Sequence, residues 1–286
     1  MILDYSTARP SISQLKQANV TAVGRYIGWD SVPGFSSIGK NLTPAEAHRY
    51  ISNGIDIFLA FEYGARAPTQ GAAQGTKDGN LASKQLHDLG APPNMGVYFA
   101  VDFDIPDYAP NLPDDPANAR SKLGPVAHYF EAIHATGPKY DVDGYGGYYA
   151  IKRLLDARLI KQGWQTIAWS GGQWDNRAVL RQLTRIPPLP FTDVNIRENG
   201  STIHDYGQWP QPQPTVYWGE WLTNGHSSLH EVSLAVGRGE AQILADTVRH
   251  YGYLNSVIRA YVNSVVSGRI PSTTKIPPGG RLWVLK

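Results

Sequence analysis

The chain contains no cysteine among its 286 residues, which excludes disulfide bonds, thiol nucleophiles and cysteine-ligated metal sites. Its formal net charge is only +2, and no basic cluster interleaved with aromatic residues occurs, so nothing indicates nucleic acid binding. The apolar runs are far too short to span a membrane, and none of the eight histidines forms a zinc-binding spacing. We therefore expect no metal, no cofactor, no nucleic acid partner and no membrane insertion.

Three frequent signatures are missing as well. No Gly-x-Gly-x-x-Gly turn follows the first apolar run, so a dinucleotide site is not expected. The run Ser170-Gly171-Gly172 lacks the Gly-x-Ser-x-Gly elbow, which disfavours a serine hydrolase. No secretory signal is visible, because Asp4 follows the first residue almost at once. A role outside the cell would then require another route of export or release.

Apolar strand patterns alternate with helical patterns over about 210 residues, which predicts an α/β fold. Thr43, Pro44 and Glu46 have the spacing of a helix start with a capping side chain. We favour a TIM-like (β/α)8 barrel, with a doubly wound open sheet as the alternative. The predicted strands are 2–5, 22–27, 56–61, 96–102, 144–149, 165–170, 192–196 and 203–209, and the predicted helices are 11–18, 43–53, 77–89, 117–136 and 151–161.

The alternating prolines of 210–214 form a stiff linker, the best domain boundary in the chain. We predict a barrel over 1–209 and a small α+β module over 215–286. Residues 214–286 carry seven Lys/Arg and four Asp/Glu, whereas the rest of the chain carries 19 and 20. The module is expected to have strands near 215–218 and 281–285 and helices near 229–235, 240–251 and 255–267.

Four acids follow predicted strands: Asp4, Glu62, Asp102 and Asp104. The strand that precedes the last two is uniformly apolar, as in a parallel sheet covered on both faces. In a parallel barrel all strands end on one face, so these carboxyl groups should converge there. Glycoside hydrolysis requires two carboxyl groups in different roles. The Asp-x-Asp spacing is equally compatible with a metal-ligand pair or a loop cap.

Aromatic residues are plentiful, with 16 tyrosines and 8 tryptophans. Their faces can stack on sugar rings, although ordinary core packing explains most aromatics in any protein. Our candidates for substrate binding, which include two polar residues of the last predicted strands, are Tyr26, Tyr148, Trp169, Asn195, Asp205 and Trp209.

Short motifs along residues 1–209 resemble, in collinear order, the glycoside-hydrolase-like domain of unknown function 1906. The longest is the run Val97-Tyr98-Phe99-Ala100-Val101-Asp102-Phe103-Asp104. Each motif is short, but together they are highly specific. The others lie at 3–6 (Leu-Asp-Tyr-Ser), 25–26, 42–47, 61–62, 144–148, 164–166, 168–174 and 205–209 (Asp-Tyr-Gly-Gln-Trp).

The resemblance implies a TIM-like barrel related to the family 25 lysozymes, which cleave peptidoglycan glycan strands. It maps Asp104 onto the acid catalyst and Asp102 onto a charge stabiliser, or a partner that raises the pKa of Asp104. Asp4 corresponds to the first-strand acid and Glu62 to an acid usual in the domain family, so both are orienting or base candidates. Two departures are that Asp104 is shorter than the lysozyme glutamate, and that Val194-Asn195 replaces the usual Val-Asp.

The tail is similar to a LysM-type wall-binding module in two segments, 227–232 and 276–284, the second reading Ile-Pro-Pro-Gly-Gly-Arg-Leu-Trp-Val. The insertion near 255–269 is long for such a module, and a small accessory or assembly domain is the alternative. These resemblances imply a glycoside hydrolase-like protein that acts on bacterial cell-wall glycan, extracellular or in a virion, as a phage lysin or virion-associated protein. The alternatives are a catalytically inactive glycan-binding barrel and a structural phage tail protein that contacts other virion proteins.

Overall fold

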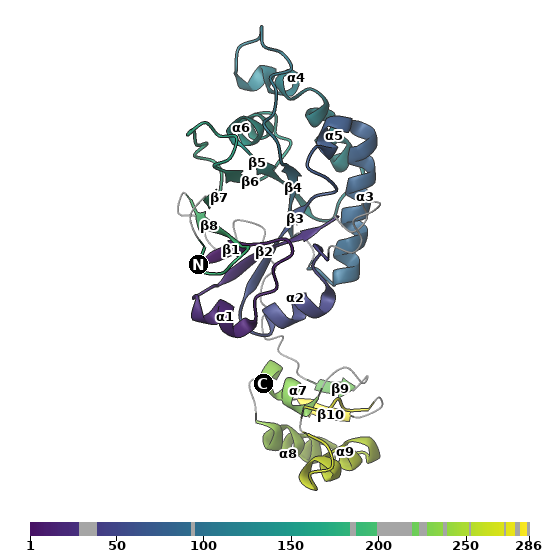
Figure 1. The fold of residues 1–286 in the computed structure, drawn as a ribbon. Helices are drawn as coiled ribbons and strands as arrows, with labels where there is room; N and C mark the ends of the chain where they lie inside the picture. Colours follow the sequence, from purple (N-terminus) through teal and green to yellow (C-terminus); the bar gives the residue numbers. More distant parts are fainter. Residues whose placement is uncertain are drawn as a thin grey trace. The chain divides into compact units, whose positions relative to one another are not determined.

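The structure is a computed structural model that describes residues 1–28, 39–92, 95–183, 187–198, 219–222, 228–236, 239–251, 253–271, 273–277 and 281–284. The chain divides into two compact units, Met1–Gln211 and Pro212–Lys286 (Figure 1). The predicted strands 203–209 and 215–218 and the predicted linker 210–214 lie outside the described residues. No helix within the described ranges is both long enough and apolar enough to cross a membrane.

The first unit is a closed eight-stranded barrel in which neighbours in sequence are neighbours in space. The first seven strands are parallel to one another, and the predicted TIM-like fold class is confirmed. The strands are β1 (Ile2–Asp4), β2 (Ala22–Ile27), β3 (Asp56–Phe61), β4 (Gly96–Val101), β5 (Asp141–Gly146), β6 (Gly163–Thr166), β7 (Leu180–Leu183) and β8 (Asp193–Arg197).

The last strand departs from a regular (β/α)8 barrel, because β8 runs antiparallel to both β7 and β1. Nine residues, 184–192, separate β7 from β8. A parallel connection requires a crossover of roughly a dozen residues or more, so this link only permits an antiparallel return. Strand β7 was not predicted, since its four residues, Leu-Arg-Gln-Leu, form neither an apolar run nor an alternating pattern. The expectation that every strand ends on the same face is therefore wrong for β8.

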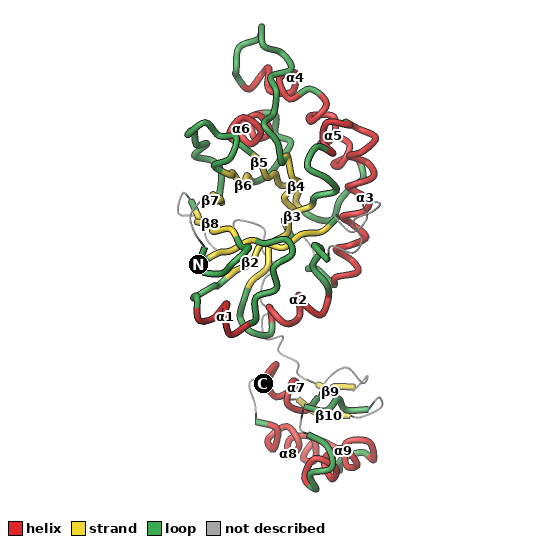
Figure 2. The backbone as a smooth tube through the Cα atoms, in the orientation of Figure 1, coloured by secondary structure: helices red, strands yellow, loops and turns green. Residues whose placement is uncertain are grey.

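Helices cover the outside of the barrel along β1–β5, whereas loops flank β7 and β8 (Figure 2). The Thr43 hydroxyl accepts a hydrogen bond of 3.2 Å from the Glu46 amide, so the predicted cap is confirmed. The predicted helix 117–136 is divided at Gly124, which has φ of 54° and lies against the Tyr108 ring. The helices are α1 (Ile12–Gln17), α2 (Pro44–Ile51), α3 (Ala72–Leu89), α4 (Ala119–Leu123), α5 (Pro125–Ala135) and α6 (Tyr148–Asp156).

The barrel interior is filled by aromatic side chains. Phe58, Tyr98 and Trp164 pack edge to face, with ring centroids 5.2–6.3 Å apart. Edge-to-face contacts of this kind stabilise a core beyond the area they bury. Gly24 has no room for a side chain, because an added Cβ would lie 2.6 Å from the Phe58 ring. The barrel is thus a packed core, and its chemistry lies at the ends of the strands.

The second unit pairs strands β9 (Gly219–Leu222) and β10 (Arg281–Val284) in an antiparallel sheet. Between them lie α7 (Leu229–Val236), α8 (Glu240–Tyr251) and α9 (Ser256–Val266), close to the three predicted helices. A core of its own holds the unit together: Leu229, Val232, Ile243, Ile258, Tyr261, Ile276 and Leu282.

Candidate active site

Asp102 follows β4 directly and is only half-buried, while Phe103 is buried and Asp104 is exposed. Burial and, after it, the negative charge of Glu62 raise the pKa of Asp102 to about 6, against the opposing charge of Lys40. A carboxylic acid with such a pKa keeps part of its proton near neutral pH. It can therefore donate that proton to a leaving group.

Glu62 follows β3, the strand next to β4, and its side chain is buried. It forms an ion pair with Lys40, which the chain supplies from the segment before α2. The Lys40 ammonium group also lies 4.2 Å from the centre of the Tyr26 ring. This lysine covers one face of Tyr26, so that face is not free to stack on a sugar. Glu62 is held in an ion pair with Lys40 and is therefore a weak candidate for a base.

Asp4 ends β1 and points into the barrel, where only 1% of the residue is exposed. Its carboxylate accepts hydrogen bonds from the amide groups of Asn195, at 2.7 Å, and Gln182, at 3.0 and 3.1 Å. Burial and, after it, the negative charge of Asp193 raise the pKa of Asp4 to about 7. The hydrogen bonds from the two amide groups and the charge of Arg25 oppose this rise. Asp4 cannot touch a substrate in this arrangement. Its protonation state can only change the electrostatic potential at the site from inside the barrel.

Asn195 links Asp4 to the aromatic core. The Trp164 indole N–H donates a 2.8 Å hydrogen bond to the Asn195 side-chain oxygen, which fixes the orientation of the amide. In the same layer the Tyr145 hydroxyl donates to the Gln182 side-chain oxygen at 2.7 Å. Tyr145, Trp164 and Gln182 were not predicted as site residues. The first two lie within motifs that carry the family resemblance, whereas nothing in the sequence singled out Gln182.

Asp193 is the acid that sequence reasoning missed. Because β8 is antiparallel, its first residue lies at the carboxyl end of the other strands, in register with Asp4. Asp193 reaches solvent, and partial burial raises its pKa. Burial and the charges of Asp102, Asp4 and Asp193 raise the pKa of Tyr145 well above its ordinary value. All three acids therefore lie near one tyrosine, with Asp4 and Asp193 side by side on β1 and β8 and Asp102 at the end of β4.

Two predicted stacking residues lie in the neighbouring loops. Trp169, in the loop after β6, is 39% exposed and has φ of 53°. Tyr148 lies in the first turn of α6 rather than in a strand, and its amide donates to the Ser170 hydroxyl at 3.0 Å. Both residues belong to the carboxyl end of the barrel. Asp205 and Trp209 lie outside the described residues.

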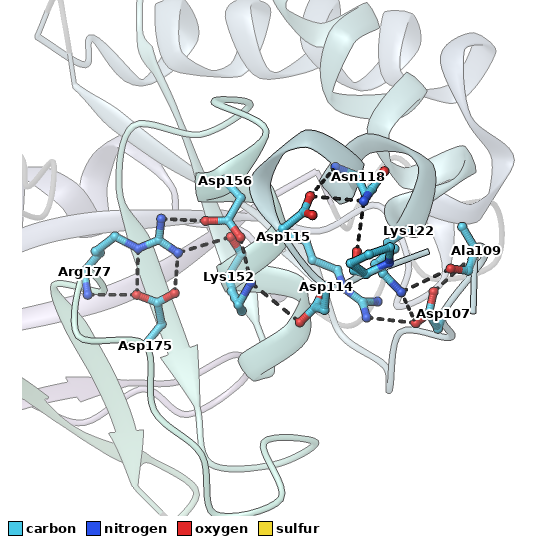
Figure 3. Close-up of polar contacts among 12 residues, drawn as sticks. Asp107, Ala109, Asp114, Asp115, Asn118, Lys122, Lys152, Asp156, Asp175 and Arg177 are labelled. Atoms are coloured by element: carbon cyan, nitrogen blue, oxygen red, sulfur yellow. Dashed lines mark hydrogen bonds and ion pairs between the residues drawn. The ribbon is translucent and has the colours of Figure 1, made fainter. Parts of the chain in front are cut away.

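An ion-pair network holds the loops after β4 and β6 against α4 and α6 (Figure 3). The buried side chains of Lys122 and Arg153 both donate to Asp107, at 2.7 and 3.2 Å, and Arg153 also donates to Asp114. On the other side Arg177 pairs with Asp175, at 2.6 Å. Removing one partner of a buried pair leaves an uncompensated charge, so the network fixes these loops. In the ranges that the structure describes, no cluster of three acids or histidines is placed to hold a metal ion.

Residues 13–199 match the family model of the Rv2525c-like, glycoside hydrolase-like domain. The chain belongs to this family. It is 25% identical, over 154 residues, to the Mycobacterium tuberculosis protein named "Putative peptidoglycan hydrolase Rv2525c". This matched region makes up 52% of this chain and 64% of that protein. It is also 34% identical, over 91 residues, to the Bacillus subtilis protein named "Uncharacterized protein FadG". This second match makes up 32% of this chain and 15% of that protein. The chain thus spans less than two thirds of each of these relatives.

The crystal structure of the Tat-secreted M. tuberculosis protein Rv2525c in complex with L-tartrate has the same fold. The two structures superpose with a TM-score of 0.60 at 22% sequence identity, over 73% of this chain and 98% of that one. At this level of identity the likeness establishes the barrel and not the chemistry.

Proposed function

We propose that the barrel hydrolyses glycosidic bonds in bacterial cell-wall glycan. The observation that carries the proposal is Asp102, a half-buried acid with a pKa raised to about 6 at the carboxyl end of the barrel. The name of the M. tuberculosis relative supports a peptidoglycan substrate, and the secretion of that protein supports an extracellular or wall location. A raised carboxyl pKa at this end of a barrel is the state that a general acid requires.

Asp102 acts as the general acid in this proposal, in place of the more exposed Asp104. It donates its proton to the glycosidic oxygen as the bond from that oxygen to the anomeric carbon breaks. Asp193 accepts a proton from the water whose oxygen attacks the anomeric carbon. The products are an alcohol and a free reducing end, and proton exchange with solvent restores both acids. Asp104 stays near the substrate as a second exposed carboxylate.

Asp193 is preferred as the base over Glu62 and Asp4, because both of those acids are engaged by other side chains. Glu62 is paired with Lys40, and Asp4 is enclosed by amide groups. Asp193 comes from β8 and Asp102 from β4, which are four strands apart around the eight-stranded barrel. Inverting glycosidases separate their carboxyl groups by roughly 6.5–9.5 Å to admit a water, against about 5 Å in retaining enzymes. The placement on opposite strands favours inversion.

Digestion of purified bacterial cell wall tests the proposal. The wild type should release fragments with new reducing ends, detected by mass spectrometry, and Asp102→Asn should lower the rate by ~10²–10⁴-fold. Asp141→Asn is the matched control, because Asp141 begins β5 at the opposite end of the barrel. Walls left intact by the wild type would refute hydrolysis. If Asp104→Asn abolished the release of fragments while Asp102→Asn kept the wild-type rate, the role of general acid would belong to Asp104.

A glycan-binding barrel without catalysis is the second candidate. The observation that favours it is Asn195, which supplies a neutral amide to Asp4 at a position where the sequence resemblance implies an acid. Retention of wall fragments by the wild type, without any cleavage, would establish this alternative.

We further propose that the second unit is a LysM-like wall-binding module. Its antiparallel strand pair encloses helices, as in such modules, and it carries an excess of basic residues. The third helix, α9, is an addition to that pattern. Neither relative named above is described as a phage protein, so association with a phage lysin or virion stays a prediction from the sequence.

A further inference from the structure

Tyr26 lies one residue before the end of β2, the strand between β1, which ends at Asp4, and β3, which leads to Glu62. Its side chain packs against the cluster inside the barrel, as does that of Ala22 on the same strand. Ile27, the next residue, belongs to the cluster that the strands share with the helices. Successive side chains of a strand point to opposite faces, so Tyr26 points into the barrel at its carboxyl end.

The acids of the candidate site lie close to the Tyr26 hydroxyl. Burial raises the pKa of Tyr26 well above its ordinary value, and four neighbours that are negative when ionised raise it as well: Asp4, Tyr145, Glu62 and Asp102. An electrostatic influence of this kind fades with distance, so the hydroxyl lies among these groups. It keeps its proton throughout the neutral pH range and is available there as a hydrogen-bond donor.

The Tyr26 ring is held by a cation rather than by its hydroxyl. The Lys40 ammonium group lies 4.2 Å from the ring centre, and its ion pair with Glu62 fixes it there. A cation over an aromatic face is an attractive contact that leaves the ring edge and its hydroxyl uncovered. In the part of the chain that the structure describes, the Tyr26 hydroxyl makes no hydrogen bond, and the residue is only partly buried.

The neighbouring neutral donors are already engaged. The Tyr145 hydroxyl donates to the Gln182 side-chain oxygen at 2.7 Å. The amide groups of Gln182 and Asn195 both donate to Asp4. Carboxylates can only accept hydrogen bonds when they are ionised, and the oxygens of a sugar require donors. The Tyr26 hydroxyl is therefore a donor that remains available to a bound sugar.

We propose that Tyr26 is a catalytic residue whose hydroxyl donates a hydrogen bond to an oxygen of the sugar whose anomeric carbon is attacked. The proposal rests on the proposed function and adds a neutral donor to its two acids. A donor that is already held in place by Lys40 does not have to reorganise as charge develops on the sugar. Hydrogen bonds to the reacting sugar that strengthen in the transition state add to the rate of glycoside hydrolysis.

Tyr26→Phe tests the proposal, because it removes the hydroxyl and keeps the ring that Lys40 covers. We expect kcat for the hydrolysis of soluble peptidoglycan glycan strands by the full chain to fall by about 10- to 100-fold, with a smaller change in KM. The urea midpoint of unfolding should stay the same, because the hydroxyl loses no partner within the protein. The alkaline limb of the pH–rate profile should stay in place, because Tyr26 is not among the groups that set the pKa of Asp102.

Tyr140→Phe is the matched control. The Tyr140 hydroxyl donates a 3.1 Å hydrogen bond to the backbone oxygen of Gly79, and the residue precedes β5 at the opposite end of the barrel. This variant should show the reverse pattern, a lower urea midpoint with an unchanged kcat. An unchanged kcat in Tyr26→Phe would overturn the proposal. So would a loss of kcat that comes with a lower urea midpoint or a displaced alkaline limb, since the residue would then act through the fold or through Asp102.

Binding separates the role of Tyr26 from the function on which it rests. If the wild type leaves glycan strands intact, the proposed hydrolysis fails, and calorimetry with a soluble tetrasaccharide of the peptidoglycan strand decides on Tyr26. Binding that Tyr26→Phe weakens by about 3- to 10-fold would support the contact between the hydroxyl and the sugar. Equal binding by the wild type and the variant would overturn that contact. No binding by the wild type, together with intact strands, would overturn both.

Discussion

Asn195 donates a 2.7 Å hydrogen bond to the carboxylate of Asp4 inside the barrel, and both residues are almost completely buried. The Trp164 indole group fixes the amide from the other side. A carboxylate with several N–H donors is stabilised in its charged form, whereas burial favours the neutral form. Here burial prevails, and the pKa of Asp4 rises to about 7. Because position 195 is an asparagine, Asp4 is the single carboxyl group of this buried pair. Two neighbouring negative charges at this depth would both lack solvation.

Asn195→Asp should destabilise the protein increasingly as the pH rises. The new carboxyl group would lie within hydrogen-bonding distance of Asp4, so the two would share one proton, and losing it would leave two buried negative charges. We expect a loss of about 3 kcal/mol in the free energy of unfolding at pH 8 and a smaller loss at pH 5. Urea unfolding at both pH values measures it. The exposed Asn176→Asp is the control, and an equal effect at both pH values would refute the explanation.

Asp4→Asn should change how stability depends on pH. The pKa of Asp4 is about 7 in the folded protein and near 3.8 when unfolded. The protonated form favours folding, so this contribution is complete below pH 3.8 and is lost as the pH rises through 7. Removing the acid should make the curve of unfolding free energy between pH 4 and pH 8 flatter, by ~2–4 kcal/mol over the range. Parallel curves for the variant and the wild type would contradict the raised pKa.

The sequence predicted β1–β4 well, because they are largely apolar and turn residues lie between them, whereas β5 (Asp141–Gly146) has a mixed pattern and was predicted three residues too late, at 144–149. Asp4, Glu62 and Asp102 were placed correctly at strand ends, since each follows such a run. The closing strands could not be predicted in the same way. β7 has four residues with a mixed pattern, and once it is missed, the short link to β8 cannot be recognised as antiparallel.

That one reversal explains why Asp193 was overlooked. In a parallel strand an acid at the first position would lie at the far end of the barrel, away from the other acids. The antiparallel direction brings it into register with Asp4 instead. The roles of the acids were also beyond the sequence, because burial and neighbouring charges decide them. Asp102 and Asp104 are alike in sequence, yet one is half-buried beside Glu62 and the other is exposed.

The second unit, expressed as residues 212–286, should sediment with insoluble bacterial wall. Its own buried core indicates that it can fold alone, and residues 214–286 contain seven basic and four acidic residues. We expect most of the unit to pellet at low salt and part of it to be released at high salt, because surface charges are screened. Residues 1–211 serve as the comparison. If they pellet and the second unit stays in the supernatant, the LysM-like assignment is wrong.

Glu62→Gln should move the alkaline limb of the pH–rate profile to lower pH. Activity requires protonated Asp102, so the rate should fall as the pH rises through about 6. The negative charge of Glu62 raises the pKa of Asp102, and Lys40, which pairs with Glu62, lowers it. Replacing Glu62 with glutamine removes the negative charge that raises the pKa of Asp102. It also leaves the positive charge of Lys40 without its partner, so both changes lower the pKa of Asp102, by about 1 unit. The measurement is kcat for wall or glycan hydrolysis between pH 4 and pH 8. Asp141→Asn, at the far end of the barrel, should leave the limb in place, and a limb that Glu62→Gln does not move would remove Asp102 from the role of acid.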